Sequence, residues 1–331
     1  MPSAPPSVTN PIPAIVGPTA SGKSDLGISL AQQIDGEIIN LDSVQVYRRL
    51  YIATAKVPPE ERRGVPHHLI DIAEPADNFT AGEYARRAAA VIWDIESRGR
   101  VPILVGGTGF YLRALVRPLF ESPATDLQLR ERLRRLSDRH GREYLHRMLA
   151  RLDPAAARRV EPRNLPRTMR ALEVRFQTGR RLSDLQPDTP VSPDFAGRVQ
   201  VIALSPPRQE LYEKINRRAD YMFEAGLVEE VRALLAEGIT PHAKAFQAHG
   251  YRRVVEHLLG QRTRESALEQ MKLDTRHYAK RQLTWWRAWP DVAWINRFGD
   301  DSASLEEALA CLAAELTTEE NPNRIRWNGS R

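Results

Sequence analysis

Gly17-Pro-Thr-Ala-Ser-Gly-Lys-Ser24 (GPTASGKS) follows a short apolar run that ends at Val16 and precedes a helical pattern of apolar residues. The spacing fits G-x-x-x-x-G-K-[ST], in which glycines allow backbone N–H groups to approach phosphate oxygens closely. The following helix offers the positive end of its dipole, Lys23 a point charge and the Ser24 hydroxyl a ligand for Mg²⁺. The stretch therefore predicts a site for a di- or triphosphate, ATP among them, formed by Gly17, Pro18, Thr19, Ala20, Ser21, Gly22, Lys23 and Ser24.

Short apolar runs alternate with helical patterns on both sides of this loop. Residues 80–98 predict a helix that opens with a capping box, because Thr80 is followed three places later by Glu83. Apolar strands that alternate with helices are typical of a parallel sheet covered on both faces. We expect an α/β fold, a P-loop NTPase-like parallel sheet core with a mostly α-helical insertion domain. Its further strands are predicted at 37–41, 67–72, 101–105, 199–205 and 292–296.

The insertion is predicted from a change in composition. Residues 126–181 contain sixteen arginines and seven acids, a local charge of +9 that exceeds the +6 of the whole chain. Such a block is typical of a surface that binds a polyanion, although a solvated helical face is the alternative. The predicted organisation is a disordered tail (1–13), the first part of the core (14–120), a basic helical insertion (121–198), the resumed core with a further helical region (199–316) and a second disordered tail (317–331).

Composition excludes several other classes of protein. One cysteine in 331 residues excludes an internal disulfide and a cysteine-rich zinc module. No apolar run approaches the ~20 residues of a membrane span, and residues 1–13 lack the features of a signal peptide. We therefore expect a cytoplasmic protein without membrane association, and a monomer.

The acidic residue expected beside the phosphate loop is Asp42. An ordinary P-loop NTPase has a Mg²⁺-binding aspartate at the end of an apolar strand, but VPILV at 101–105 ends in GGTG (106–109) instead. Asp42 follows the strand at 37–41, and the carboxyl edge of a parallel sheet is where ligands bind. At this point Asp42 is either a metal ligand or a general base, and Asp71 is a weaker substitute for the missing metal ligand.

Several motifs together resemble one enzyme family. GPTASGKS, LDSVQVY (41–47), HHLID (67–71), VGGTGFYLRAL (105–115) and TRHYAKRQLTWWR (275–287) occur in the order seen in bacterial tRNA dimethylallyltransferases. The resemblance implies transfer of a dimethylallyl group from dimethylallyl pyrophosphate to the N6 amine of the adenosine 3′ to the anticodon, with Mg²⁺ and release of pyrophosphate. It makes Asp42 the general base, places Thr108 near the reacting centre and makes Arg218 a contact of the pyrophosphate.

The same resemblance implies contacts with the anticodon stem-loop of tRNA, and it makes the basic insertion (121–198) a tRNA-binding domain and the helical region within 199–316 a tRNA-contacting one. Between 276 and 289 arginines alternate with aromatic residues, a pattern suited to unstacked bases, although a buried aromatic helix face explains the tryptophans equally well. The chain departs from the family pattern at 163–166, which leaves the side-chain roles there open. The implied tRNA contacts are Asp42, Ser43, Val44, Gln45, Thr108, Arg130, Pro166, Arg167, Thr168, Met169, Arg170, Ala248, His249, Gly250, Tyr251, Arg252, Arg253, Lys280, Arg281 and Gln282.

Two other functions fit the residues. A nucleotide or nucleoside kinase could use the same fold, with the insertion as a lid. A non-catalytic RNA-binding protein could use the phosphate loop only to sense a nucleotide. Asp42 discriminates among the three functions, because Asp42→Ala should abolish prenyl transfer while tRNA binding persists.

Overall fold

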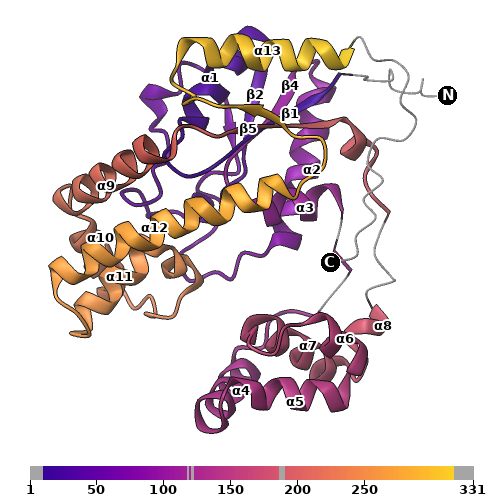
Figure 1. The fold of residues 1–331 in the computed structure, drawn as a ribbon, viewed down its shortest axis with the longest axis vertical. Helices are drawn as coiled ribbons and strands as arrows, with labels where there is room; N and C mark the ends of the chain where they lie inside the picture. The colour runs from indigo at the N-terminus through magenta and orange to yellow at the C-terminus, as the bar shows by residue number, and fades with distance from the viewer. Residues whose placement is uncertain (1–9, 118, 121–122, 186–190, 317–331) are drawn as a thin grey trace. The chain divides into compact units, whose positions relative to one another are not determined.

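The computed structural model describes residues 10–117, 119–120, 123–185 and 191–316. Within these residues the six strands form one sheet in the order β3-β2-β4-β1-β5-β6, and every neighbouring pair is parallel (Figure 1). The α/β fold is therefore confirmed. The strands are β1 (Ile12–Val16), β2 (Gly36–Asn40), β3 (His67–His68), β4 (Val101–Val105), β5 (Val199–Leu204) and β6 (Ala293–Ile295).

The strand order decides which loops meet. β4 lies between β2 and β1, with Val105 paired to Asn40 on one side and to Ile15 on the other. Because parallel strands end at the same edge of a sheet, the segments that follow β2, β4 and β1 are neighbours there. These segments carry Asp42, Thr108 and the phosphate loop.

Successive residues of each strand face opposite sides of the sheet, and both sides are covered. Ile15 packs in the core that α1 (Lys23–Gln33) and α13 (Ser302–Leu316) share, whereas its neighbours Ala14 and Val16 pack with α2 (Ala81–Ser97) and α3 (Gly109–Val116). Figure 1 shows α1 and α13 on one side of the sheet and α2 and α3 on the other. The predicted capping residue is confirmed, since Thr80 Oγ1 accepts the N–H of Glu83 at 3.2 Å.

Four helices lie between β5 and β6. They are α9 (Arg208–Glu224), α10 (Leu227–Ala236), α11 (His249–Leu258) and the long α12 (Arg264–Arg287). α12 packs against α9, α11 and α3, so it links the helical region to the sheet core (Figure 1). The 3₁₀ helices η1 (Pro59–Glu61), η3 (Asp194–Arg198) and η4 (Lys244–Gln247) belong to the first of two compact units, which comprises the described residues 10–116 and 193–316.

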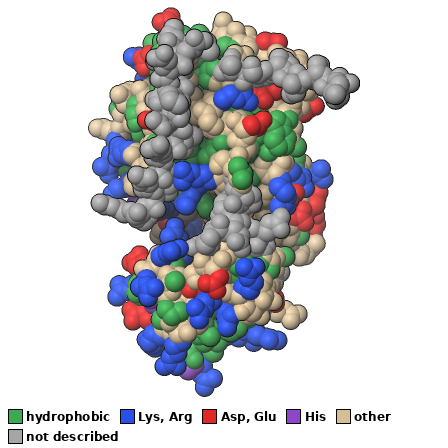
Figure 2. Space-filling view, turned by 90° about the vertical axis from the view of Figure 1, so that its right-hand side faces the viewer, with side chains coloured by type: hydrophobic (Ala, Val, Ile, Leu, Met, Phe, Trp, Pro, Cys, Tyr) green, Lys and Arg blue, Asp and Glu red, His purple; other side chains and the backbone are tan. Residues whose placement is uncertain are grey.

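Residues 117–192 form the second compact unit, which is helical. Leu133, Leu145, Leu149 and Leu172 are at the centre of its own apolar core. Figure 2 shows many Lys and Arg side chains on the surface of this unit, in agreement with its composition. Its helices are α4 (Leu127–His140), α5 (Arg142–Leu152), α6 (Pro154–Arg159), α7 (Leu165–Thr178) and α8 (Leu182–Leu185).

The structure corrects two predicted boundaries. The strand predicted at 67–72 ends at His68, because Leu69 and Asp71 adopt positive φ angles of 61° and 55° that interrupt an extended chain. β1 begins at Ile12, inside the segment predicted as a disordered tail. The rest of the two predicted tails, residues 1–9 and 317–331, lies outside the described residues. No helix of the described residues is long and apolar enough to cross a membrane.

Candidate active site

The phosphate loop has the backbone that its sequence requires. Gly17 and Gly22 have φ angles of 140° and 82°, and Ala20 adopts 64°, a value that costs a non-glycine residue about 1 kcal/mol. A Cβ atom at Gly17 would lie 2.8 Å from the Leu204 carbonyl oxygen, so β5 leaves room only for glycine. α1 begins at Lys23, so the last two residues of the loop are the first two of the helix, which places the helix N-terminus at the loop as predicted.

Two cations and one carboxylate meet beside this loop. Burial lowers the pKa of Lys23 to about 8; the Asp42 carboxylate partly opposes this shift, and the Arg218 guanidinium adds to it. Burial also lowers the pKa of Arg218, again opposed by Asp42. Arg217 is exposed, so the register of α9 favours Arg218 as the residue that faces the site. A pair of desolvated cations is suited to a ligand with several negative charges.

The Asp42 carboxylate is fixed by its own turn. Its Oδ1 accepts the N–H groups of Val44 at 2.8 Å and Gln45 at 3.3 Å, while its backbone N–H donates to Asn40 Oδ1 at 3.1 Å. Asn40 is buried and donates in turn to the Leu69 carbonyl at 3.0 Å. Asp42 is therefore a turn-capping residue whose second carboxylate oxygen makes no hydrogen bond within the described part of the chain.

Thr108 connects the ends of β2 and β4. Its Oγ1 accepts the Ser43 N–H at 3.0 Å and donates to Ser43 Oγ at 3.4 Å. The Tyr278 hydroxyl from α12 joins this pair: burial and the nearby Asp42 carboxylate raise the pKa of Tyr278, and a hydrogen bond with the Thr108 side chain opposes the shift. Sequence reasoning grouped Tyr278 with the aromatic residues of the RNA-facing segment. Its place beside Thr108 depends on the packing of α12.

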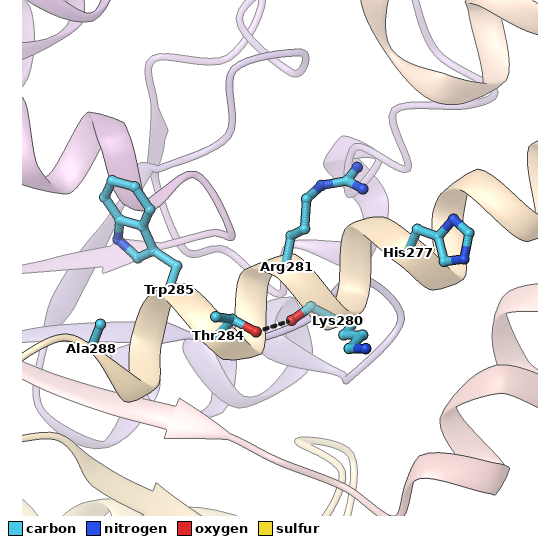
Figure 3. A pocket seen from close by; sticks show the side chains of 6 residues that line it. All are labelled: His277, Lys280, Arg281, Thr284, Trp285 and Ala288. Atoms are coloured by element: carbon cyan, nitrogen blue, oxygen red, sulfur yellow. Dashed lines mark hydrogen bonds between the residues drawn. The ribbon is translucent and has the colours of Figure 1, made fainter. Parts of the chain in front are cut away.

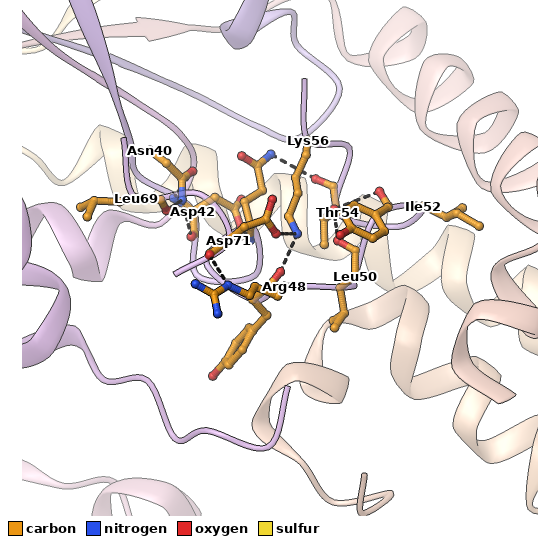
Figure 4. A network of polar contacts seen from close by, with 12 residues as sticks. Asn40, Asp42, Arg48, Leu50, Ile52, Thr54, Lys56, Leu69 and Asp71 are labelled. Atoms are coloured by element: carbon orange, nitrogen blue, oxygen red, sulfur yellow. Dashed lines mark hydrogen bonds and ion pairs between the residues drawn. The ribbon is translucent and has the colours of Figure 1, made fainter. Parts of the chain in front are cut away.

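The loop after β2 is held by a polar network that sequence reasoning missed (Figure 4). Lys56 is almost completely buried, and its ammonium group pairs with Asp71 at 2.7 Å and donates to the Tyr47 carbonyl. Gln45 Nε2 donates to the Thr54 carbonyl at 3.1 Å. Asp71 is thus a partner of Lys56, which accounts for its position without a metal ion.

An open groove runs along the exposed face of α12, with a volume of about 540 Å³. Its side chains come from successive turns of one helix face, as Figure 3 shows. The exposed guanidinium of Arg281 lies over the Tyr278 ring, 5.8 Å from its centroid. Trp286, by contrast, is fully buried, so the alternative of a core aromatic holds for that ring. The groove is lined by His277, Lys280, Arg281, Thr284, Trp285 and Ala288.

The remaining predicted tRNA contacts divide by burial. Side-chain contacts at Thr168, Met169 and Tyr251 do not fit the structure, because these side chains are packed in the apolar interior. Tyr251 instead donates to Glu230 Oε1 at 2.7 Å. Gly250 and Gln282 are also buried, and the His249 side chain lies outside the described part. The predicted contact residues that are exposed at the surface are Pro166, Arg167, Arg252, Lys280 and Arg281.

Three predicted contact arginines are already ion-paired. Glu173, fully buried, binds Arg130 at 2.9 Å and Arg170 at 2.5 Å. Arg253 pairs with Asp274 at 2.6 Å and with Glu256 at 2.7 Å. Each pairing fixes a guanidinium in place, and direct contact of these residues with RNA remains a prediction.

The donor atoms near the loop fit Mg²⁺ only together with a phosphate ligand. Among the described residues there is no group of three or more His, Cys, Asp or Glu side chains that could hold a metal ion. Mg²⁺ is commonly bound by one or two protein oxygens, substrate phosphates and water. The half-exposed Ser24 at the start of α1 suits that pattern.

Comparisons with known proteins agree with this architecture. A model of the family described as IPP transferase matches residues 45–289. The tRNA dimethylallyltransferase of Solibacter usitatus is 47% identical over 307 residues, which cover 92% of this chain and 99% of the relative. That of Koribacter versatilis is 48% identical over 297 residues, 89% of this chain and 95% of the relative.

Solved structures give the same result. The full-length tRNA isopentenylpyrophosphate transferase of Bacillus halodurans superposes with a TM-score of 0.67 at 38% identity, over 93% of this chain and 96% of that one. The structure of a eukaryotic dimethylallyltransferase acting on tRNA superposes with a TM-score of 0.71 at 27% identity. The match covers 92% of this chain and 77% of that one.

The parallel sheet with its surrounding helices and the glycine-rich loop define an α/β protein with a P-loop-like core. The family match spans more than half of the chain, and relatives of similar length share nearly half of its residues. The chain belongs to the IPP transferase family. It is a prenyl-transferring enzyme that modifies tRNA, and the comparisons give no support to the kinase alternative.

Proposed function

We propose that the donor is dimethylallyl pyrophosphate and that the acceptor is the N6 amine of the adenosine 3′ to the tRNA anticodon. The observation that supports this most directly is the meeting of Lys23, Arg218 and Asp42 at one sheet edge. Two cations beside a phosphate loop suit a diphosphate, and a carboxylate next to them suits an amine that loses a proton. The enzyme would work as a monomer in the cytoplasm.

The residues divide the reaction between them. The bond between the allylic carbon and the diphosphate oxygen breaks, and the amine nitrogen forms a bond to that carbon. Lys23, Arg218 and the loop N–H groups stabilise the charge that develops on the departing pyrophosphate. The free oxygen of Asp42 accepts the proton lost by the amine, while its Oδ1 keeps the carboxylate oriented through Val44 and Gln45. Thr108 positions the acceptor, and Tyr278 positions Thr108.

Mg²⁺ would be held by Ser24 together with the diphosphate oxygens. When bound, the ion neutralises charge on the leaving group. ATP is a weaker candidate for the loop, because no acidic residue follows β4 in the place where P-loop NTPases hold their metal ion.

The tRNA would bind along the groove of α12 and the arginine-rich surface of residues 117–192. A base within a structured loop must leave its stack before an acid at the sheet edge can reach its amine. Lys280 and Arg281 are exposed along this groove, where they would contact the RNA backbone or stack on the displaced bases.

The test is a reaction of the enzyme with dimethylallyl pyrophosphate, Mg²⁺ and unmodified tRNA, followed by mass spectrometry of the nucleosides. We expect an adenosine heavier by one dimethylallyl group at a single position, and none when ATP replaces the prenyl donor. Transfer or hydrolysis of phosphate from ATP, without a prenyl adduct, would instead support the kinase.

A further inference from the structure

Helix α12 contacts the phosphate loop with the side opposite its exposed groove residues. Ala279 of α12 is buried together with Leu211 and Ile215 of α9, and the loop residue Ala20 packs against this cluster. One turn further along α12, Gln282 is buried between the loop and the GGTG segment. The helix that carries Lys280 and Arg281 on one side therefore touches the phosphate loop with the other.

The Gln282 amide bridges two backbone segments that follow different strands, β1 and β4. Its Oε1 accepts the N–H of Thr19 at 2.9 Å, and its Nε2 donates to the carbonyl of Gly107 at 3.0 Å. An N–H can only donate and a carbonyl can only accept, so the two partners fix the orientation of the amide. A Cβ atom at Gly107 would lie 2.0 Å from Nε2, so the bridge requires glycine at this position.

We propose that Gln282 is a positioning residue for the diphosphate rather than a contact of the tRNA. It holds the loop after β1 at a fixed distance from the segment after β4, the two segments that carry Thr19 and Thr108. Its oxygen and its nitrogen each make a hydrogen bond inside the protein, and only 5% of the residue is exposed, so burial keeps the rest of the amide away from RNA. This inference rests on the proposed diphosphate site.

The alternative is that Gln282 contacts the tRNA, as its exposed neighbours Lys280 and Arg281 are expected to do. Lys280 and Arg281 precede it directly in the sequence, but successive residues of a helix point about 100° apart. Gln282 is buried, whereas Lys280 and Arg281 are exposed. A contact with RNA predicts a loss of tRNA affinity on substitution, whereas a positioning role predicts a loss of diphosphate affinity.

The experiment compares Gln282→Met with Gln270→Met in the full-length enzyme. Methionine is similar in length to glutamine but neither accepts from Thr19 nor donates to Gly107. Gln270 provides a matched control on the same helix, since its amide donates only to Asp274 at 2.9 Å in the described part of the chain. Calorimetric titration with inorganic pyrophosphate and Mg²⁺ gives one dissociation constant, and filter binding of unmodified tRNA gives the other.

For Gln282→Met we expect the pyrophosphate dissociation constant and the KM for the prenyl donor to rise about tenfold. The tRNA dissociation constant should stay within twofold, and Gln270→Met should match the wild type in both. A change confined to tRNA affinity, or no change in either constant, would overturn the proposal.

Two further results separate possible causes of failure. If the wild type itself does not bind pyrophosphate, the proposed diphosphate site fails, and the role of Gln282 fails with it. If Gln282→Met does not fold, Gln282→Asn decides, because it keeps a buried amide but is one methylene too short to reach both partners. It should show the same selective loss of pyrophosphate affinity, and normal pyrophosphate affinity would overturn the positioning role.

Discussion

Oδ1 of Asp42 accepts the backbone N–H of Val44 at 2.8 Å, so the carboxylate proposed as the base also caps the turn that carries it. Asp42→Asn retains an oxygen for this bond and loses the ability to take a proton. We expect kcat to fall by roughly 10²- to 10⁴-fold, the usual contribution of a general base, with the turn intact. Single-turnover kinetics at saturating donor and tRNA would measure the loss.

The control for this variant is tRNA affinity, which should match that of the wild type. Asp42→Ala should be less stable than Asp42→Asn, because it removes the capping oxygen as well, a loss of about 1 kcal/mol. Full activity in Asp42→Asn would show that another group removes the proton.

The lowered pKa of Lys23 predicts a pH dependence of diphosphate binding. In the free enzyme the ammonium group is charged below pH 8 and loses its proton as the pH rises through about 8. A bound diphosphate favours the charged form, so binding above this pH requires uptake of a proton. We expect the dissociation constant to rise by up to tenfold per pH unit above about 8.

Lys23→Arg provides the comparison, since a guanidinium keeps its charge throughout this range. The variant should bind more weakly at pH 7, because the geometry of the charge differs, and its affinity should change less between pH 8 and 9. A steep, identical pH dependence in both proteins would assign the titration to the diphosphate and not to Lys23.

The sequence was sufficient to predict the sheet edge, but not the helix that packs against it. The strand at 101–105 and the phosphate loop follow from local patterns, and parallel pairing then brings Asp42, Thr108 and the loop together. The bridge from Gln282 to Thr19 spans 263 residues, so no local pattern contains it. Tyr278 lies beside Thr108 for the same reason.

Motif resemblance also gave stretches of contact residues without the direction of each side chain. In α7, Arg167 is exposed while the next two residues, Thr168 and Met169, face the interior. Helical periodicity alone, applied to 165–178, would have separated them. The burial of Tyr251 depends on Glu230 of α10 and could not be read from the motif around it.

The ion pairs of Glu173 predict how stability of the helical unit depends on pH. Burial would raise the pKa of Glu173, but hydrogen bonds from Arg130, Arg170 and the Asp126 N–H outweigh this effect and lower the pKa from its ordinary value. The ion pairs contribute their full stabilisation when the pH is above the pKa of Glu173 in the unfolded chain. This contribution is lost as the pH falls through the lower pKa of Glu173 in the folded protein. Urea unfolding of the full chain should show a decrease in unfolding free energy in that acidic range.

Glu173→Gln tests this assignment. Removing a buried charge from between two arginines should destabilise the unit by about 2 kcal/mol at pH 7, after allowance for the partial exposure of both guanidinium groups. Glu131→Gln is the matched control on α4, where Glu131 pairs with Arg134 and Arg135 at the surface, and its effect should be much smaller. Equal effects of the two substitutions would contradict the central place of Glu173.

Phosphate contacts by exposed cations predict that tRNA affinity falls steeply with salt. Each neutralised phosphate contributes about 0.7 to 0.9 to the slope of log affinity against log salt concentration. Lys280 is exposed on the groove face of α12, so Lys280→Gln should weaken tRNA binding and reduce the slope by about that amount.

Lys272→Gln provides the control on the same helix, because the Lys272 ammonium group is already paired with Asp220 at 2.7 Å and Glu269 at 2.9 Å. Filter binding between roughly 50 and 200 mM salt would compare the variants. An unchanged slope in Lys280→Gln would place the RNA backbone elsewhere, and a flat dependence in the wild type would refute the basic surface as the binding site.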